Sequence, residues 1–251
     1  MIYRVLALGL AVLWPAVQGA PADERITVSA AVSLTDAMAE AAEAYSRTGH
    51  GVRFNFGASN VLARQIVSGA PVDVFVSADE VQMDVVAAAG LLKAGSRVPL
   101  LRNQLAIAVP GDRPRTFRSV REIADPAFKR IAIGDPAAVP AGVYAKAYLQ
   151  KEGLWPAIEA RIVPTGSVRA ALAAVESGAA DAAIVYRTDI RVSPKATVAW
   201  TVSASDGPRI VYPGAVIGTT KAAGEAQRFL DFLRSSVAIR IFERFGFTPY
   251  Q

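Results

Sequence analysis

Short apolar runs alternate with amphipathic stretches along most of the chain. Residues 25–31, 51–57 and 72–78 read RITVSAA, GVRFNFG and VDVFVSA, and their apolar, β-branched and aromatic content predicts buried strands. The stretches between them place apolar residues three or four positions apart, which predicts helices with one buried face. Repeated strand–helix alternation predicts an α/β fold with a mainly parallel sheet that helices flank on both faces.

Two long extended segments interrupt this alternation. Residues 100–112 lie in mid-chain, and residues 208–216 lie near the end. Strands of this length could carry the chain out of a first lobe and back again, so that the first lobe would be discontinuous. The alternative is one large doubly wound sheet, and the pattern alone slightly favours that single sheet.

The first 22 residues differ from the rest of the chain. They carry a positive charge at Arg4, an apolar run over 5–14 and the small residues Ala20-Pro21-Ala22. This layout is typical of a cleavable secretory signal peptide over 1–22. The alternative, a membrane anchor, is disfavoured because the apolar run is too short to span a bilayer comfortably. We therefore predict an exported, soluble protein whose mature chain begins near residue 23.

Composition narrows the possible chemistry. The chain has 251 residues, 52% of them hydrophobic, and a formal net charge of +5. The positive side chains are scattered rather than gathered in a stripe with aromatic residues, which argues against nucleic-acid binding. The absence of cysteine removes thiol catalysis and cysteine-based metal sites. A single histidine, His50 in an expected turn, makes a histidine zinc site or a Ser-His-Asp triad unattractive, so we expect no enzyme.

Small residues and hydroxyls gather where the expected strands run into helices. A helix N-terminus presents unpaired backbone N–H groups and a partial positive charge, which suits an anion. Several such ends converging from two lobes could hold a dianion with neutral donors alone. The alternative for each serine taken singly is a plain N-cap, as in the capping-box-like start formed by Ser33 and Asp36. The junctions contain Ser33, 57–59, 77–79, 134–144, 166–168 and Tyr186.

The junction at residues 134–144 reads GDPAAVPAGVY and is almost without charge. Proline lacks an N–H group and fixes φ, and it biases the preceding residue away from the helical region. Pro140 therefore predicts an extended Val139 and a helix that begins at about Ala141. The first free N–H group after Pro140 is then that of Ala141, with Gly142 beside it and no bulky side chain in the way.

Five segments of the chain resemble, in order and in spacing, the periplasmic molybdate-binding protein (ModA) family. They are AAVSLTDAM, FGASNVLARQIVSGAPVDVFVSAD, GDPAAVPAGVYAKAYLQKEGLW, VRAALAAVESGAADAAIVYRTD and FERFGFTPY, and the resemblance covers residues 26–250. It implies a two-lobed type II periplasmic-binding-protein fold with the ligand cleft between the lobes. It also favours the discontinuous division, with lobe one at 23–102 plus 210–251 and lobe two at 103–209.

The same resemblance implies residues that bind a tetrahedral MoO₄²⁻ or WO₄²⁻ anion. In this family, serine hydroxyls, a tyrosine hydroxyl and backbone amides hold the oxyanion. By motif, the implied hydroxyl donors are Ser33, Ser59 and Tyr186. The implied backbone donors are Ala141 and Val168. These residues would contact oxygens of the anion, and the resemblance implies no direct metal ligand, no cofactor and no catalytic residue.

One segment departs from the family pattern. Related sequences often carry a run of serines where this chain reads Gly57-Ala58-Ser59-Asn60. Ser59 still falls on the ligand position, whereas Ala58 and Asn60 replace the neighbouring hydroxyls. The anion contact expected of Ser59 is therefore kept.

The implied function is capture of molybdate or tungstate in the periplasm and delivery to the membrane permease of a molybdate ABC transporter, by a monomer. The nearest alternative is a binding protein for another tetrahedral oxyanion, such as sulfate or thiosulfate. A secreted serine hydrolase is a weaker alternative, because the chain has no G-x-S-x-G elbow. The effector domain of a transcription regulator is disfavoured by the expected signal peptide and by the lack of a helix-turn-helix-like extension.

Overall fold

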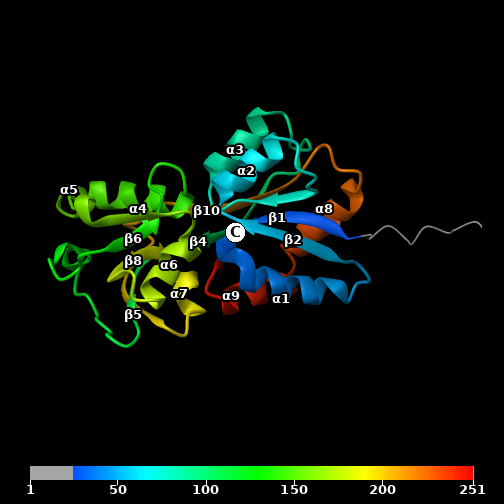
Figure 1. Cartoon of the computed structure of the whole chain (residues 1–251). Helices are drawn as coiled ribbons and strands as arrows, with labels where there is room; N and C mark the ends of the chain where they lie inside the picture. The colour runs from blue at the N-terminus through cyan, green and yellow to red at the C-terminus, as the bar shows by residue number, and fades with distance from the viewer. Residues whose placement is uncertain (1–24, 251) are drawn as a thin grey trace, which may run out of the picture.

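A computed structural model describes residues 25–250 of the protein. The expected signal peptide, residues 1–22, lies outside the described residues. The chain folds into two groups of strands and helices that lie side by side (Figure 1). Each group is built on its own sheet, so two sheets replace the single doubly wound sheet that the alternation alone favoured.

The first sheet has six strands in the order β11-β4-β10-β3-β1-β2. Its strands are β1 (Ile26–Ala31), β2 (Val52–Gly57), β3 (Val74–Val76), β4 (Val98–Asn103), β10 (Ile210–Val216) and β11 (Thr248–Pro249). Helices α2 and α3 cover one face, and α1 and α9 lie on the other (Figure 1). The helical segments of this group are η1 (Val32–Leu34), α1 (Thr35–Ser46), α2 (Ser59–Val67), α3 (Glu80–Ala88), α8 (Ala223–Phe232) and α9 (Ser236–Arg244).

The second sheet has five strands in the order β7-β6-β8-β5-β9. Its strands are β5 (Leu105–Pro110), β6 (Ile131–Gly134), β7 (Ile162–Thr165), β8 (Ala182–Tyr186) and β9 (Ala196–Thr201). Helices α4 and α6 both pack on β6 and β8. The helical segments of this group are η2 (Val120–Ala124), α4 (Pro140–Lys151), α5 (Trp155–Ile158), η3 (Glu159–Arg161), α6 (Val168–Glu176) and α7 (Arg187–Arg191).

Each sheet is mixed, which corrects the expectation of mainly parallel pairing. Parallel pairing holds for β1 with β2 and β3, and for β6 with β7 and β8. Strand β10 is antiparallel to β3 and β4, and β5 is antiparallel to β8 and β9. Strand β11 is also antiparallel, to β4. Strands β5 and β10 each follow a crossing of the chain between the sheets, so they enter their sheet from the other lobe rather than through a helical crossover.

The chain passes between the sheets at Gln104 and again between β9 and β10. The first sheet thus takes its strands from residues 26–103 and 210–249, and the second takes its strands from residues 105–201. Below, lobe one is the part built on the six-stranded sheet and lobe two the part built on the five-stranded sheet. The finer lobe boundaries, at 102/103 and 209/210, stay a prediction.

The central strands are apolar on both faces because helices cover both. All five residues of β8 and all seven of β10 are buried, and burial of such aliphatic side chains is the main driving force for folding. Within residues 25–250, no helix combines the length and the apolar character that crossing a membrane requires.

Candidate functional site

The carboxyl ends of strands from both lobes meet at one pocket, which is where open α/β sheets bind ligands. The empty space between the lining residues, including the part that is open to solvent, is about 220 Å³. Every lining residue is uncharged. All five residues implied by the family resemblance are among them. The lining residues are Ala31, Val32, Ser33, Gly57, Ala58, Ser59, Ala78, Val139, Pro140, Ala141, Val168 and Tyr186.

Ser33 lies in the short η1 turn between β1 and α1 and is buried. Its Oγ lies 3.0 Å from the hydroxyl oxygen of Tyr212 on β10. The capping-box-like start expected from Ser33 and Asp36 is wrong, because η1 intervenes and α1 begins only at Thr35 without a side-chain cap. The Ser33 hydroxyl therefore bonds to Tyr212 and does not cap its own helix.

Ser59 is the first residue of α2, and Ala58 occupies the N-cap position without a side-chain hydrogen bond. The Ser59 Oγ accepts a hydrogen bond from the backbone N–H of Ala78, at 2.9 Å. A hydroxyl that accepts one bond still has its own proton to donate. The contact with Ala78 thus fixes the Ser59 oxygen beside the pocket and leaves its O–H group available as a donor.

The loop before α4 has the backbone conformation that its prolines predict. Val139 is extended, with φ −80° and ψ 126°, and Pro140 is the first residue of α4. The helix therefore begins one residue earlier than expected. The N–H groups in the first turn of a helix have no partner within the helix. Ala141, which is almost completely buried in the pocket wall, carries the first such N–H group after Pro140.

Val168 is the first residue of α6 and holds a corresponding position in lobe two. Ser167 caps this helix, and its Oγ accepts from the backbone N–H of Ala170 at 3.2 Å. The plain N-cap role considered for each serine thus belongs to Ser167 rather than to Ser33 or Ser59. The N–H of Val168 lies in the first turn, among those without an intrahelical acceptor.

Tyr186 ends β8 and has a hydroxyl that is buried without a hydrogen-bond partner among the described residues. The side chain is 1% exposed, and burial raises the pKa of its hydroxyl well above the ordinary value. The hydroxyl therefore stays protonated and remains a donor at physiological pH. An unpaired buried polar group costs about 1–3 kcal/mol, which a ligand acceptor in the pocket would offset.

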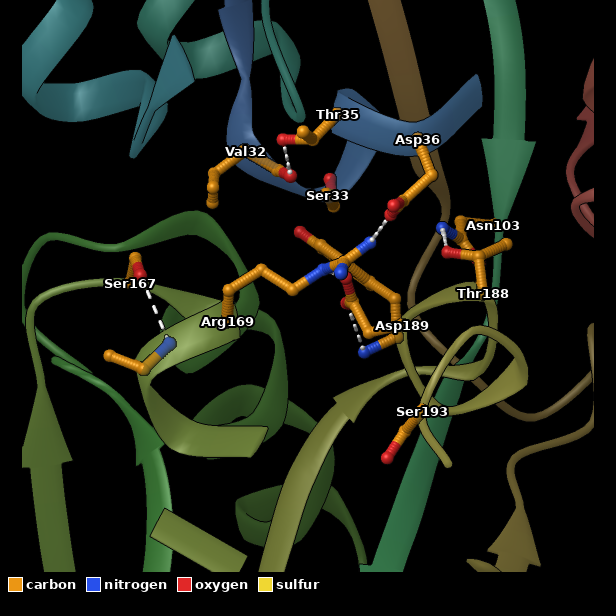
Figure 2. A network of polar contacts seen from close by, with 12 residues as sticks. Val32, Ser33, Thr35, Asp36, Asn103, Ser167, Arg169, Thr188, Asp189 and Ser193 are labelled. Atoms are coloured by element: carbon orange, nitrogen blue, oxygen red, sulfur yellow. Dashed lines mark hydrogen bonds and ion pairs between the residues drawn. The ribbon is translucent and has the colours of Figure 1, made fainter. Parts of the chain in front are cut away.

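One arginine beside the pocket forms ion pairs with two carboxylates, and none of these three side chains lines the pocket (Figure 2). Arg169 follows Val168 on α6. Its Nε lies 2.6 Å from Oδ1 of Asp189 in α7, and its Nη2 lies 2.7 Å from Oδ2 of Asp36 in α1. The pocket thus presents dipoles and hydroxyls, and the guanidinium beside it binds two carboxylates through Nε and Nη2.

A chain of hydrogen bonds links Ser33 of lobe one to lobe two. The Asn103 amide nitrogen donates to the Tyr212 hydroxyl at 3.2 Å and to the Thr188 hydroxyl at 2.9 Å. Asn103 ends β4, next to the crossing between the sheets, and Thr188 belongs to α7. The position of Ser33 is therefore coupled through Tyr212 and Asn103 to the segment that joins the lobes.

No three His, Asp or Glu side chains between residues 25 and 250 gather in an arrangement that could hold a metal ion. The chemistry available at the pocket is hydrogen-bond donation to a compact acceptor.

Comparison with known proteins assigns the chain to a family. Residues 26–248 match the family described as bacterial extracellular solute-binding protein. The chain belongs to this family. Molybdate-binding protein ModA of Escherichia coli (strain K12) is 37% identical, over 97% of this chain and 96% of its own. A putative ABC transporter substrate-binding lipoprotein, YvgL of Bacillus subtilis (strain 168), is 36% identical over 89% and 86%.

A solved structure supports the same assignment. The periplasmic molybdate-binding protein of Azotobacter vinelandii is similar to this chain with a TM-score of 0.81 and 27% sequence identity, covering 90% of this chain and 100% of its own. The predicted membership of the ModA family and the two-lobed periplasmic-binding-protein fold are confirmed. These relatives are named as binding proteins or substrate-binding components of transporters, not as enzymes.

Sequence reasoning missed the supporting residues of this family member. Arg169 and Asp189 each lie next to or near an implied ligand residue, so their place in the motifs was a usable signal. No such signal marks Asn103 and Tyr212. Both lie in expected strands, and they meet only in the folded protein, because they are 109 positions apart in the sequence. Local spacing cannot reveal such a pair.

The buried carboxylate predicts a pH effect on stability that Asp189→Asn should remove. Burial raises the pKa of Asp189 from 3.8 to about 6, although Arg169 opposes the rise. Between these values the folded protein keeps a proton that the unfolded chain has released. The contribution of Asp189 to the free energy of unfolding therefore falls as pH rises through this window, by up to about 1.4 kcal/mol per pH unit.

Urea unfolding of both proteins at several pH values between about 4 and 7 measures this effect. The free energy of unfolding of the wild type, minus that of Asp189→Asn, should decrease with rising pH up to about 6 and then level off. Parallel curves for the two proteins across this range would contradict the raised pKa of Asp189.

Proposed function

We propose that this chain captures molybdate or tungstate in the pocket between its lobes and delivers the anion to the membrane permease of an ABC importer. The observation that carries the proposal is the lining of the pocket: it is uncharged, lies at helix N-termini and contains a buried Tyr186 hydroxyl without a protein acceptor. Its relatives named as molybdate-binding proteins support the same ligand.

The proposed donors fit an anion that only accepts hydrogen bonds. Ser33, Ser59 and Tyr186 would donate hydroxyl protons, and Ala141 and Val168 would donate backbone N–H groups. Helix N-termini add a partial positive charge without a flexible side chain that must be ordered on binding. A fully deprotonated tetrahedral oxyanion has an acceptor on every oxygen, so a site made of donors satisfies it completely.

The same donor set disfavours monohydrogen phosphate. That anion carries a proton, which requires an acceptor such as a carboxylate. The lining residues have no charged side chain to supply one. Sulfate has the charge and shape of molybdate but is smaller, so discrimination against it would depend on how closely the two lobes surround the anion. Sulfate or thiosulfate binding is thus the alternative that the test must include.

The proposal places the protein outside the cytoplasmic membrane as a monomer that works without a cofactor and without catalysis. Membership of an extracellular solute-binding family supports export, and the expected signal peptide at residues 1–22 supports the same location. Because donors come from both lobes, ligand binding would favour hinge closure. The closed form would then be the species that the permease recognises.

Isothermal titration calorimetry of the mature protein with four anions tests the proposal. Molybdate and tungstate should bind more tightly than sulfate, and phosphate should bind most weakly. Equal affinity for sulfate and molybdate would show that the site binds tetrahedral oxyanions in general and is not specific for molybdate. No heat of binding with any of the four would show that the pocket is not an oxyanion site.

A further inference from the structure

One ion-pair network bridges the two lobes beside the pocket. Arg169 belongs to α6 in lobe two, and Asp36 belongs to the first turn of α1 in lobe one. The two residues are 133 positions apart, and Figure 2 shows the guanidinium between Asp36 and Asp189. A contact of this kind can exist only while α1 and α6 face each other across the cleft.

The guanidinium is already fixed within its own lobe. Asp189 has a side chain that is 0% exposed, and it accepts both from Nε of Arg169 and from the backbone N–H of Tyr186. The planar arginine fork leaves Nη2 free to bind a second carboxylate in a set direction. Because Asp189 holds the arginine in place, little side-chain entropy remains to be lost when Asp36 arrives.

The two arms of this network differ in burial. The Arg169 side chain is 25% exposed and the Asp36 side chain is 43% exposed. The arm to Asp189 is buried inside lobe two, whereas the arm to Asp36 is open to solvent on one side. The interlobe arm is therefore the one that solvent can reach and that can break without leaving an unpaired charge in the core.

The network also lies next to proposed ligand contacts on both sides. In lobe two, Val168 precedes Arg169 directly, and the Asp189 carboxylate holds the Tyr186 backbone. In lobe one, Asp36 stands three positions after Ser33. The ion pair thus joins the two segments that would carry donors to opposite sides of the anion.

We propose that Arg169 is a positioning residue whose ion pair with Asp36 holds the lobes closed and slows release of the bound anion. It would not contact the anion itself, because it is not among the residues that line the pocket, and its Nε and Nη2 already bind carboxylates. The inference deepens the proposed function and rests on it. Its kinetic signature is specific: an interaction made only in the closed form lengthens the lifetime of the complex and leaves the encounter rate almost unchanged.

The main test compares Asp36→Asn with the wild type. This change removes the charge of the interlobe arm and keeps Arg169 paired with Asp189. Release of radioactive molybdate after rapid dilution into excess unlabelled molybdate gives the dissociation rate, and calorimetry gives Kd. We expect dissociation to become about three- to tenfold faster, as for a half-exposed charge-assisted pair, with the association rate changed less than about twofold.

Two further variants separate the interlobe pair from general charge effects. Asp84→Asn removes a carboxylate that pairs with Arg97 within lobe one, and it should leave both rates unchanged. Arg169→Lys keeps the charge but has one ammonium in place of the fork that reaches two carboxylates. It should therefore accelerate dissociation as Asp36→Asn does. Salt should accelerate dissociation more in the wild type than in Asp36→Asn.

A measurement of lobe separation makes the test independent of kinetics. The sequence has no cysteine, so Val85→Cys in α3 and Val163→Cys in β7, both partly exposed, would give one spin label on each lobe. With saturating molybdate, Asp36→Asn should broaden the distance distribution toward more open forms. A dissociation rate and a distance distribution both equal to those of the wild type would overturn the inference. Failure of the wild type to bind any oxyanion would instead overturn the proposed function.

Discussion

Tyr186→Phe should weaken molybdate binding without weakening the fold. The hydroxyl is buried, protonated and unpartnered within the described part of the chain. Its loss removes no hydrogen bond from the protein, so the free energy of unfolding should stay the same or rise. The bound dianion, in contrast, would lose one of its donors. We expect a loss of about 1–3 kcal/mol in binding, or about five- to 150-fold in Kd.

Tyr212→Phe is the comparison for stability, because Tyr212 is also completely buried and lies 5.9 Å from Tyr186, ring to ring. Its hydroxyl is bonded to Ser33 and Asn103. Removing it should lower the free energy of unfolding by about 1 kcal/mol. Calorimetric titration with urea unfolding on both variants separates the two roles. If Tyr186→Phe bound molybdate with wild-type affinity, the Tyr186 hydroxyl would not be a donor to the anion.

The parts of the site that sequence could predict are those controlled by local structure. A strand that runs into a helix places backbone N–H groups and small side chains at the carboxyl edge of the sheet, and this depends on neighbouring residues only. Pro140 is an example: it makes Val139 extended and starts α4, whatever the rest of the chain does. The five implied residues accordingly meet in one pocket.

The parts that could not be predicted depend on contacts between distant segments. Local spacing predicts a capping role for Asp36, but Arg169, 133 positions away, binds its carboxylate instead. The mixed pairing of the sheets has a similar origin. Strands β5 and β10 contain nothing that distinguishes parallel from antiparallel neighbours, and their direction follows from where the chain crosses between lobes.

Gly142→Ala should be the most damaging single substitution at the pocket, although it exchanges a glycine for the best helix former. Inside a helix, alanine is more favourable than glycine by about 0.5–1 kcal/mol. Gly142 lies in the first turn of α4 with an ordinary helical φ. Its Cα, however, faces the end of β6 so closely that an added Cβ would overlap the carbonyl group of Gly134 and lie 2.9 Å from the carbonyl carbon of Asp135.

These neighbours are backbone atoms, so no side chain can turn away to make room. The start of α4 must move off β6, and Ala141 must move with it. Overpacking against a rigid neighbour costs about 1–3 kcal/mol and occasionally more. We expect the upper end of this range, because the overlap is with backbone. The steric cost therefore exceeds the gain in helix propensity, and molybdate affinity should fall at least about tenfold, which is about 1.4 kcal/mol.

Gly166→Ala provides the control on the other helix of lobe two that borders the pocket. Gly166 directly precedes Ser167, the N-cap of α6, and an added Cβ there would meet nothing within 4 Å. It should leave both stability and affinity close to those of the wild type. Urea unfolding and calorimetric titration of the two alanine variants measure both effects. If Gly142→Ala matched Gly166→Ala in both measurements, close packing of α4 on β6 would not determine where the Ala141 N–H group lies.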